Sequence, residues 1–402
     1  MFRYLSFIAT TFIFWNLWST LTLAQGKKLE ELDKFPPSPL EIITSDPLLP
    51  LGGDKRELTA EERQNLSKVL DELNQEALVK LQGGDKVAAF EIWNRELRLR
   101  RFLGTFAEIE ALSRVGTIAV RENEGQQVQY ITQRVKAIEK QLVEQKSTDL
   151  DLWRSLGVAY QSLRLPKLAV EVYQQVLTLV RQQQDSTAEL ATLNTIGELH
   201  LSWFNYPPAA TTYRELLNLA INKRDRVNEV VYLRRLAEIY TRTKEYQQVI
   251  EVLVKLANIY TAENDLTQIP ALKIAIATNY ESLAQKNPNL IQEAFNNYQE
   301  AYITAWELEQ HTRASEALQK LIALYRSRQQ TNEALQASKI LIETEKLATN
   351  FYGLMQAYDQ MAQLYLQRQE YPQALTAFQE GLKLAIQLKH QEIYFIEQIE
   401  KL

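Results

Sequence analysis

The sequence has no cysteine and only three histidines among its 402 residues. Without cysteine, the chain can form no disulfide, thiolate zinc site, iron–sulfur cluster or thiol nucleophile. Glycine (12) and proline (11) are scarce, which excludes a collagen-like chain and disfavours a turn-rich all-β fold. The 45 Lys and Arg residues nearly balance the 50 Asp and Glu residues, for a net charge of −5. Such a balance provides no whole-chain field for nucleic acid.

The residues that remain form no arrangement typical of an enzyme. His200, His311 and His390 lie far apart in the sequence, and there is no His-x-x-x-His pair, glycine-rich phosphate loop or Gly-x-Ser-x-Gly motif. We therefore predict a chain that is not an enzyme and has no cofactor and no bound metal. We also predict that His200 is a packed core residue.

The first 24 residues differ from the rest of the chain. Arg3 is their only charged residue, and the segment ends with Thr22-Leu23-Ala24, which places small residues at −3 and −1 of a cleavage site. This is the form of a secretory signal peptide, although the uncharged run is also long enough for a membrane span. Cleavage predicts an exported protein of the periplasm or thylakoid lumen, whereas retention predicts a membrane-anchored one. The lack of cysteine excludes a bacterial lipoprotein.

Residues 25–59 are expected to form a linker. Five of the 11 prolines lie between Pro36 and Pro50, and Gly52 and Gly53 follow. Proline removes amide donors and disfavours helix in the residue before it, so we expect an extended spacer or a disordered terminus. Thr59 and Glu62 then form a capping-box pattern that predicts the start of a helix.

A period of 40 residues governs the rest of the chain. Gly157, Gly197, Ala237 and Ala277 are 40 residues apart, and further markers follow at Ile322 after 45 residues and at Ala362 after 40. The extra five residues fall in a polar stretch around Pro288, which we interpret as a lengthened turn. Aromatic residues follow the markers in the same frame: Tyr160, Tyr240, Tyr280, Tyr325 and Tyr365 three residues later, and Tyr173, Tyr213, Tyr298 and Phe378 further on.

The period has a simple packing explanation. Two antiparallel helices approach closely only where a small residue lies at their crossing, and large aromatic side chains then fill the neighbouring space. A single hairpin leaves one face uncovered, so it must stack on copies of itself. The prolines beyond the linker all fall at predicted turns or helix starts, which agrees with this arrangement.

The run Trp153-x-x-Leu156-Gly157-x-x-Tyr160, followed by Ala169 and Tyr173, resembles the tetratricopeptide repeat (TPR) signature. The resemblance implies an all-α fold, an α-solenoid of stacked antiparallel helix hairpins (the TPR superhelix). The usual repeat is about 34 residues, so a 40-residue repeat implies longer helices. We predict six repeats over residues 149–388, preceded by two divergent hairpins over 60–148. Residues 389–402 are expected to form a capping helix with an apolar stripe of Ile393, Ile396, Ile399 and Leu402.

In TPR proteins the first helix of each repeat lines a concave groove that holds a peptide or protein segment. Carried over to this chain, the resemblance places twelve residues in a partner-binding groove: Arg154, Gln161, Asn194, Glu198, Arg234, Glu238, Arg242, Glu281, Gln319, Arg326, Asp359 and Gln363. This lining is polar and mixed in sign. It departs from the Lys and Asn pattern of chaperone-binding TPR domains, so a segment carrying both charge signs fits better. We therefore expect a protein or peptide partner and no nucleic acid.

A basic run lies ahead of the repeats, at Arg95, Arg98, Arg100 and Arg101. Its alternation with Glu96 and Leu97 favours a solvated helix face over a site for phosphates or an acidic partner. The segment Trp93–Phe102 and the proline-rich entry are similar to those of exported cyanobacterial TPR proteins, some of which assist photosystem assembly or pigment-enzyme docking.

The sequence as a whole predicts a non-catalytic scaffold for protein–protein interaction. We expect it to be exported or tethered to a membrane through an uncleaved N-terminus, with assembly of membrane complexes as one role. The alternative is a regulatory sensor whose groove binds a small peptide signal.

Overall fold

The computed structural model describes residues 38–42, 46–50, 52–53 and 56–402. The predicted signal peptide or anchor, residues 1–24, lies outside them, as do residues 25–37 of the predicted linker. The described part of the chain is built of helices, and no strand occurs in it. None of the helices described is both long enough and apolar enough to span a membrane. The chain divides into two compact units, Met1–Ser147 and Thr148–Leu402, which are treated separately below.

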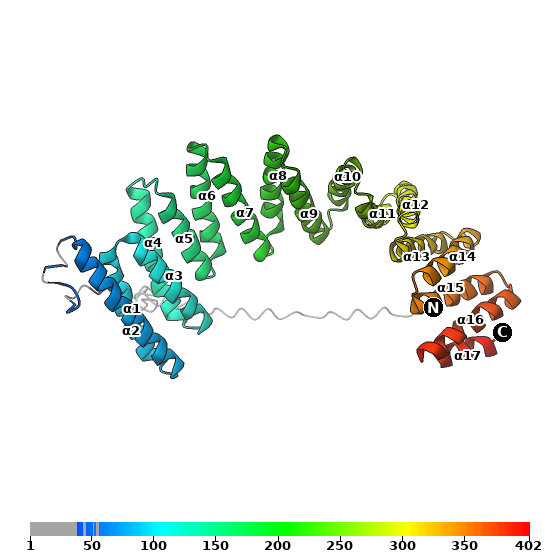
Figure 1. Ribbon diagram of the computed structural model, residues 1–402, viewed down its shortest axis with the longest axis horizontal. Coiled ribbons are helices and arrows are strands. Elements are labelled where there is room, and N and C mark those ends of the chain that lie inside the picture. Colours follow the sequence, from blue (N-terminus) through cyan, green and yellow to red (C-terminus); the bar gives the residue numbers. More distant parts are fainter. Residues whose placement is uncertain (1–37, 43–45, 51, 54–55) are drawn as a thin grey trace, which may run out of the picture. The chain divides into compact units, whose positions relative to one another are not determined.

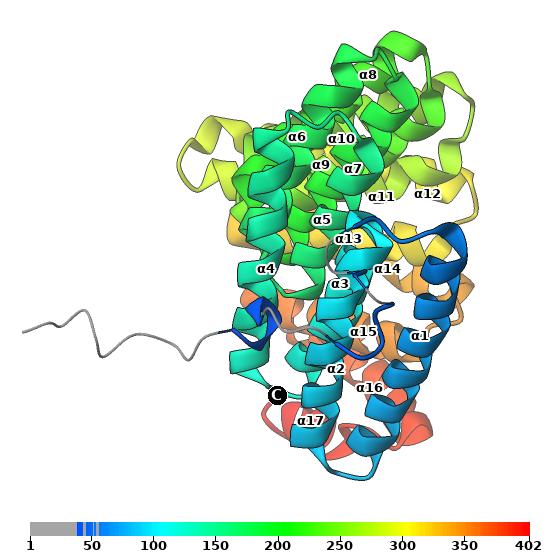
Figure 2. The same cartoon turned by 90° about the vertical axis from the view of Figure 1, so that its left-hand side faces the viewer.

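The first unit contains two helix hairpins (Figure 2). Thr59 caps its first long helix: its hydroxyl accepts a hydrogen bond from the Glu62 amide, and the Glu62 carboxylate accepts one from the Thr59 amide at 2.8 Å. Arg56 bonds the same carboxylate and, with the Thr59 amide, lowers the pKa of Glu62 to about 2. The predicted capping box is therefore confirmed. The elements are η1 (Pro39–Glu41), α1 (Ala60–Gln82), α2 (Lys86–Arg100), η2 (Arg101–Leu103), α3 (Thr105–Arg121) and α4 (Gly125–Glu144).

The second unit is a row of helices, each packed against the next along the chain (Figure 1). Contacts are local because each hairpin touches only its neighbours, which is the property that defines a solenoid. The predicted fold class, an all-α solenoid of stacked antiparallel hairpins, is confirmed. The elements are α5 (Leu150–Ser162), α6 (Pro166–Gln182), α7 (Ser186–Ser202), α8 (Tyr206–Lys223), α9 (Arg226–Thr243), α10 (Tyr246–Ala262), η3 (Leu266–Gln268), α11 (Ile269–Ala284), η4 (Pro288–Leu290), α12 (Ile291–Glu307), α13 (His311–Ser327), α14 (Thr331–Leu347), α15 (Phe351–Gln367), α16 (Tyr371–Leu388) and α17 (Glu392–Glu400).

The turns of the second unit repeat at half the sequence period. A residue with positive φ ends most helices, and none of these residues is glycine. In the turn between α5 and α6, the Leu165 amide donates to the Tyr160 carbonyl at 2.9 Å, and the Arg164 amide donates to the Gln161 carbonyl at 2.9 Å. This is the Schellman pattern, which satisfies the last carbonyls of a helix. The residues are spaced by 20 except across the five-residue insertion: Arg164, Gln184, Phe204, Arg224, Lys244 and Asn264, then Glu309, Gln329, Thr349, Gln369 and Lys389.

The prolines lie where the sequence predicted. Each one beyond the linker falls in the first turn of a helix or, for Pro288, in the short η4 of the lengthened turn. Proline is tolerated there because those amides have no partner within the helix. The helix starts are Pro166 in α6, Pro207 and Pro208 in α8, Pro270 in α11 and Pro372 in α16.

Small marker residues let an aromatic ring lie against the backbone of the facing helix. A Cβ atom added at Gly157 would be 2.7 Å from the ring of Tyr173, and one added at Gly197 would be 3.0 Å from the ring of Tyr213. Both distances are shorter than ordinary van der Waals contact, so α5–α6 and α7–α8 depend on glycine for their separation.

Alanine has the same place in two later hairpins. Ala277 is buried in one cluster with Tyr298, and Ala362 in another with Phe378. Ala237 is only partly buried, and its hairpin has a leucine where those others carry an aromatic ring. The contact between a small marker and an aromatic ring is therefore present in the hairpins of Gly157, Gly197, Ala277 and Ala362.

The basic run on α2 is not the solvated face that we expected. Arg95 donates two hydrogen bonds to the Asp46 carboxylate, at 2.8 and 2.7 Å, and Arg98 donates to the Pro39 carbonyl at 2.7 Å. These arginines hold the segment that precedes α1 against α2. Their partners lie about 50 to 60 positions away in the sequence, which is why the local pattern did not reveal them.

Two buried carboxylates explain the rest of the run. Glu96 is fully buried and accepts from Arg100 at 2.9 Å and from Arg114 at 2.6 Å. Glu108 is also buried and lies 3.2 Å from Arg101. A buried charge requires such pairing, because an unpaired one carries a large desolvation cost. The run is therefore structural.

The described residues of the predicted linker are partly packed rather than extended throughout. Leu40 is buried, and Leu48 and Leu49 pack against an apolar cluster that includes Leu58 and Leu99. Burial of these leucine side chains removes apolar surface from water and stabilises the packed segment. The prediction of an extended linker considered only the prolines and missed this contribution.

The terminal helix α17 packs against α16, but of the predicted stripe only Ile399 packs against the last apolar cluster. Ile393 is 73% exposed and Ile396 43%, whereas Phe395 is 1% exposed. The Phe395 ring packs edge-on against Phe378, with 6.4 Å between the ring centroids. Residues spaced by three fall short of the 3.6-residue helical turn, so the isoleucines do not stay on one face of the helix. The Phe395 side chain therefore determines which face is buried.

A carboxyl group is buried near the end of the solenoid. Glu345 on α14 has no exposed surface and accepts a hydrogen bond from the Gln319 amide at 3.1 Å. Burial raises its pKa, because removal from water disfavours the charged form.

Replacing Gly157 by alanine tests the close helix crossing. Gly157→Ala should lower the free energy of unfolding by about 1–3 kcal/mol, because the new methyl group overlaps the Tyr173 ring. Gly125→Ala is the control, since a Cβ there meets open space. Equal denaturation midpoints for the two variants would contradict the packing that we describe.

Glu345→Gln tests the buried carboxyl. The native pKa is raised, so the native state binds the proton more readily and its stability falls as the pH rises above the unfolded pKa. The variant should therefore have a higher Tm than the parent at pH 8, and the difference in Tm should be smaller at pH 4. A change of 1 kcal/mol in the free energy of unfolding shifts Tm by about 2–4 °C. Glu343→Gln, on the exposed surface beside Lys346, should show no such pH-dependent gain. A gain that is the same at both pH values would argue against the mechanism.

Candidate functional site

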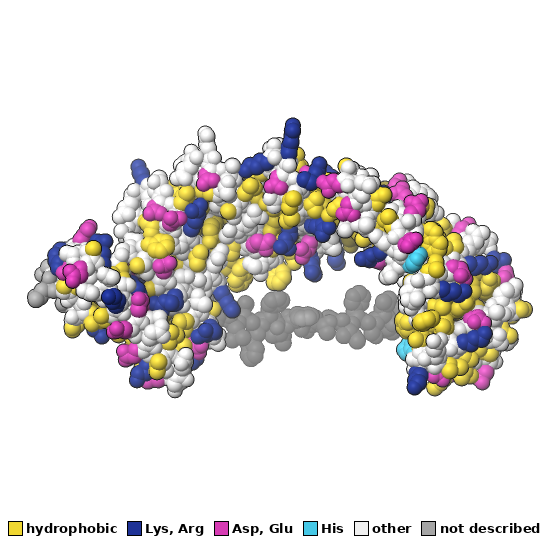
Figure 3. Space-filling model, in the orientation of Figure 1, with side chains coloured by type: hydrophobic (Ala, Val, Ile, Leu, Met, Phe, Trp, Pro, Cys, Tyr) yellow, Lys and Arg dark blue, Asp and Glu magenta, His cyan; other side chains and the backbone are white. Residues whose placement is uncertain are grey.

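The structure places every predicted groove residue on the first helix of its hairpin. They are distributed over six helices: Arg154 and Gln161 on α5, Asn194 and Glu198 on α7, Arg234, Glu238 and Arg242 on α9, Glu281 on α11, Gln319 and Arg326 on α13, and Asp359 and Gln363 on α15. Side chains of both charge signs are interspersed on the face of the second unit shown in Figure 3.

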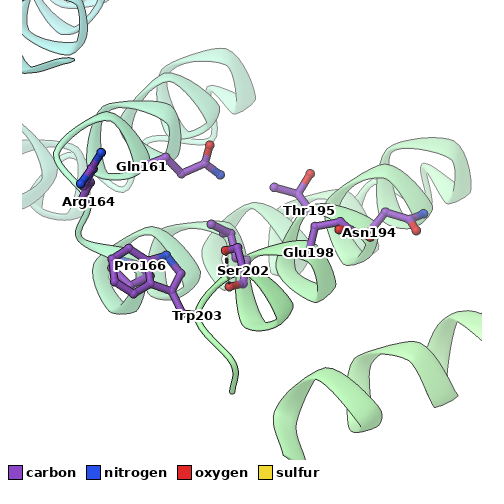
Figure 4. Close-up of a pocket in the computed structure, with 9 residues that line it drawn as sticks. Gln161, Arg164, Pro166, Asn194, Thr195, Glu198, Ser202 and Trp203 are labelled. Carbon is purple, nitrogen blue, oxygen red and sulfur yellow. Dashed lines mark hydrogen bonds between the residues drawn. The ribbon is translucent and has the colours of Figure 1, made fainter. Parts of the chain in front are cut away.

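Three of these residues come together in one hollow between α5 and α7. The hollow measures about 590 Å³ and is lined by Gln161, Asn194 and Glu198. Figure 4 shows Gln161 on α5 and Asn194 and Glu198 on α7. Trp203 and Pro166 lie at one end of the hollow. The other lining residues are Arg164, Thr195, Leu199 and Ser202.

Tyrosines hold the wall of this hollow in place. The Tyr213 hydroxyl donates to Glu198 Oε1 at 2.6 Å, and Arg235 lies 3.3 Å from the same oxygen. Asn194 Nδ2 donates to the Tyr232 hydroxyl at 3.0 Å. These bonds connect α7 to α8 and α9, so the two polar groups have fixed positions before any partner arrives.

The same kind of bond recurs along the second unit. In each case a predicted groove residue on a first helix bonds a side chain of a following helix. The pairs are Arg234 with Tyr260 at 2.7 Å, Glu281 with Tyr298 at 2.5 Å, Gln319 with Glu345 at 3.1 Å, Asp359 with Tyr394 at 2.8 Å and Gln363 with Tyr394 at 3.3 Å.

Burial and neighbouring carboxylates raise the pKa of the three tyrosines that donate to a carboxylate, Tyr213, Tyr298 and Tyr394. Desolvation is the larger cause for Tyr213 and Tyr298, and the bonds to Glu198 and Glu281 add to it. For Tyr394 the same two causes raise the pKa to about 12. The phenols therefore remain protonated donors at neutral pH.

A few predicted groove residues remain available to a ligand. Within residues 56–402, no side-chain partner accompanies Gln161, Arg242 or Arg326. Arg154 pairs only with Asp151 on its own helix, at 3.3 Å. These four side chains can therefore bind a ligand without breaking a bond between helices.

Sequence reasoning missed the aromatic end of the hollow. Trp203 is 50% exposed and lines the hollow together with Pro166. The available signal was its position: Trp203 and Phe204 occupy a turn where the equivalent residues of other hairpins are mostly polar.

His200 differs from the packed core residue that we predicted. It is only partly buried, and burial lowers its pKa. It borders a second hollow of about 550 Å³ on the other side of Trp203, together with Lys167 and Phe204. Among the residues that the structure describes, no group of three or more His, Asp or Glu side chains is arranged to hold a metal ion.

The comparisons with known proteins concern one segment and the fold. Residues 152–187 match the family model of the tetratricopeptide repeat, and they span most of α5, all of α6 and the start of α7. The first hairpin of the second unit thus matches the tetratricopeptide repeat, and the later hairpins have the same arrangement of two antiparallel helices. No curated protein matches the chain.

Several solved structures are similar in part. BtubC from P. vanneervenii is 17% identical over 56% of this chain and 92% of its own, with a TM-score of 0.38. MamA is 18% identical over 48% and 96%, with a TM-score of 0.35. The C-terminal part of a TPR repeat-containing protein from Cytophaga hutchinsonii is 13% identical over 68% and 95%, with a TM-score of 0.38. None of them carries an argument about the partners of this chain at such scores.

Tyr213→Phe tests the bond that fixes the hollow. Loss of the hydroxyl should lower the free energy of unfolding by about 1.5–3 kcal/mol, because the bond goes to a charged group. Tyr371→Phe is the control, since its ring is exposed and its hydroxyl has no bond among the described residues. If Glu198→Gln lowers stability equally in the parent and in Tyr213→Phe, the two groups are not coupled and the wall is not held as we describe.

Proposed function

We propose that this protein is a non-catalytic interaction scaffold that holds an extended segment of a partner protein in the hollow between α5 and α7. One observation carries the proposal: Gln161, Asn194 and Glu198, predicted from the repeat frame, line one hollow between the matched repeat and the helix α7 that follows it. Stacked hairpins of this kind form concave binding surfaces, which agrees with such a role.

The chemistry of the hollow defines the segment. The Gln161 amide both donates and accepts, which suits the main chain of an extended peptide. Glu198 and Arg164 at the same hollow favour a segment with charges of both signs. Trp203 supplies an apolar surface at one end, where a large side chain of the partner would pack. Hydrogen bonds to Tyr213 and Tyr232 already hold Glu198 and Asn194 in place. Binding of a segment therefore costs the scaffold little conformational entropy.

The cellular setting is a second part of the proposal. The uncharged segment before Ala24 supports export or tethering to a membrane, and assembly of membrane complexes is a role consistent with either. The Trp93–Phe102 segment adds no support for a photosystem role, because its arginines serve packing within the first unit. N-terminal sequencing of the mature chain distinguishes a cleaved signal from a retained anchor.

A crosslinking experiment tests the hollow. A photoreactive amino acid at Gln161 should give a defined product with a partner protein, whereas the same group at Gln175 should not. Gln175 is the matched control because it lies exposed on α6 and borders neither hollow. Crosslinking of equal yield from both positions would contradict the proposed site.

The charge of the groove is tested in the same assay with Arg242→Glu. We expect this variant to reduce the yield from Gln161 several-fold, because Arg242 is exposed and has no side-chain partner in residues 56–402. Arg234 is less suitable, since it bonds Tyr260 and its replacement would disturb the fold. An unchanged yield would remove Arg242 from the binding surface.

A further inference from the structure

One edge of the second unit collects the turns that join the first helix of each hairpin to its second helix. The helices alternate in direction, so these turns lie on one edge and the turns between hairpins lie on the other. The first three of them belong to α5–α6, α7–α8 and α9–α10, which are neighbours in the stack. We call Arg164, Lys167, Trp203, Phe204, Arg242 and Lys244 the turn patch.

An aromatic pair protrudes from the centre of the turn patch. Phe204 is 76% exposed and Trp203 50%. Phe204 also has a φ of +58°, a conformation that is unfavourable for a bulky side chain. The equivalent positions in other hairpins carry Arg164, Lys244 and Gln329, polar residues that lose nothing by facing water. The Phe204 ring lies edge-on to the Tyr206 ring, with 6.4 Å between the centroids, but most of its surface remains in water, and together with Trp203 it forms an exposed apolar patch.

Cations flank the aromatic pair on both sides. Arg164 and Lys167 belong to the preceding turn, and Arg242 and Lys244 to the following one. No carboxylate among the described residues forms an ion pair with any of these four. The nearby Glu245 accepts a hydrogen bond from the Thr243 hydroxyl at 2.7 Å instead. Figure 3 shows Lys and Arg side chains along the lower edge near α9 and α10.

The opposite edge differs in this respect. There Arg181 pairs with Glu189 at 2.7 Å and with Glu215, and Arg226 pairs with Glu229 at 2.8 Å and with Glu263. These two arginines are therefore compensated within the protein, although Arg224 on the same edge has no ion pair among the described residues. The turn patch thus combines four cations that have no ion pair among the described residues with two exposed aromatic rings.

We propose that the turn patch docks on an anionic lipid surface. Lysine and arginine near such a surface are attracted by the negative potential of the headgroups. Tryptophan and phenylalanine are suited to the interface, where their rings enter the boundary of the acyl chains. A lipid surface fits better than an acidic protein, because Phe204 is 76% exposed at the tip of its turn even though it also borders the second hollow, and a fluid layer adapts to a protruding ring. The inference shares Arg164 and Trp203 with the hollow between α5 and α7, but it does not require that a partner segment binds there.

The absence of cysteine makes a local test possible in the full chain. Phe204→Cys carries a single environment-sensitive fluorophore, and Val227→Cys carries the same label as the control. Val227 is 75% exposed at the start of α9, on the opposite edge. The probes are vesicles of phosphatidylcholine with and without phosphatidylglycerol. With anionic vesicles, the label at 204 should shift to the blue and be quenched by brominated lipids, whereas the label at 227 should not.

The charge requirement is tested by adding Arg242→Gln and Lys244→Gln to the labelled chain. Loss of two cations should weaken the response at 204 by about tenfold or more. Labels that respond alike at 204 and 227, or that both fail to respond, would overturn the proposal. So would a response at 204 to polyglutamate but not to anionic vesicles, which would assign the patch to an acidic protein. A melting curve of each labelled chain confirms that the fold is intact.

Discussion

An aromatic ring placed against a small residue sets the separation of the helices in the best-packed hairpins. Tyr213 on α8 shows what depends on this contact: its ring lies against Gly197 of α7, and its hydroxyl bonds Glu198, the residue that follows Gly197. Tyr298 likewise shares a buried cluster with Ala277 and bonds Glu281. One side chain therefore fixes both the helix crossing and a polar group on the candidate binding surface.

This coupling divides the groove into two kinds of residue. Glu198, Asn194 and their equivalents are committed to bonds between helices, and they present their remaining hydrogen-bonding capacity at fixed positions. Gln161 and Arg242 have no such commitment among the described residues and can adapt to a ligand. The residues bonded between helices keep fixed positions, so they lose little conformational entropy when a ligand binds. The residues without such bonds can adjust their side chains to the ligand.

The sequence predicted what depends on local periodicity: the helical fold, the positions of the prolines, the Thr59 cap and the close contacts at Gly157 and Gly197. It could not predict contacts between distant residues. The pairing of Arg95 with Asp46 depends on how the entry segment folds back, and the exposure of Phe204 depends on which side of a turn meets water. The error at α17 has a different origin, because a nine-residue helix is too short for an apolar stripe to outweigh one buried aromatic ring.

The regular spacing of the left-handed turn residues has a consequence for how the chain can change in length. Arg164, Phe204 and Lys244 occupy the same backbone conformation at the same point of successive hairpins. Removing or duplicating a stretch of 40 residues between two such points joins chain ends of matching geometry. The lengthened turn around Pro288 shows that a smaller change is accommodated outside the helices, without altering the spacing on either side. The second unit is thus modular, and whole hairpins can be gained or lost while the remaining ones keep their register.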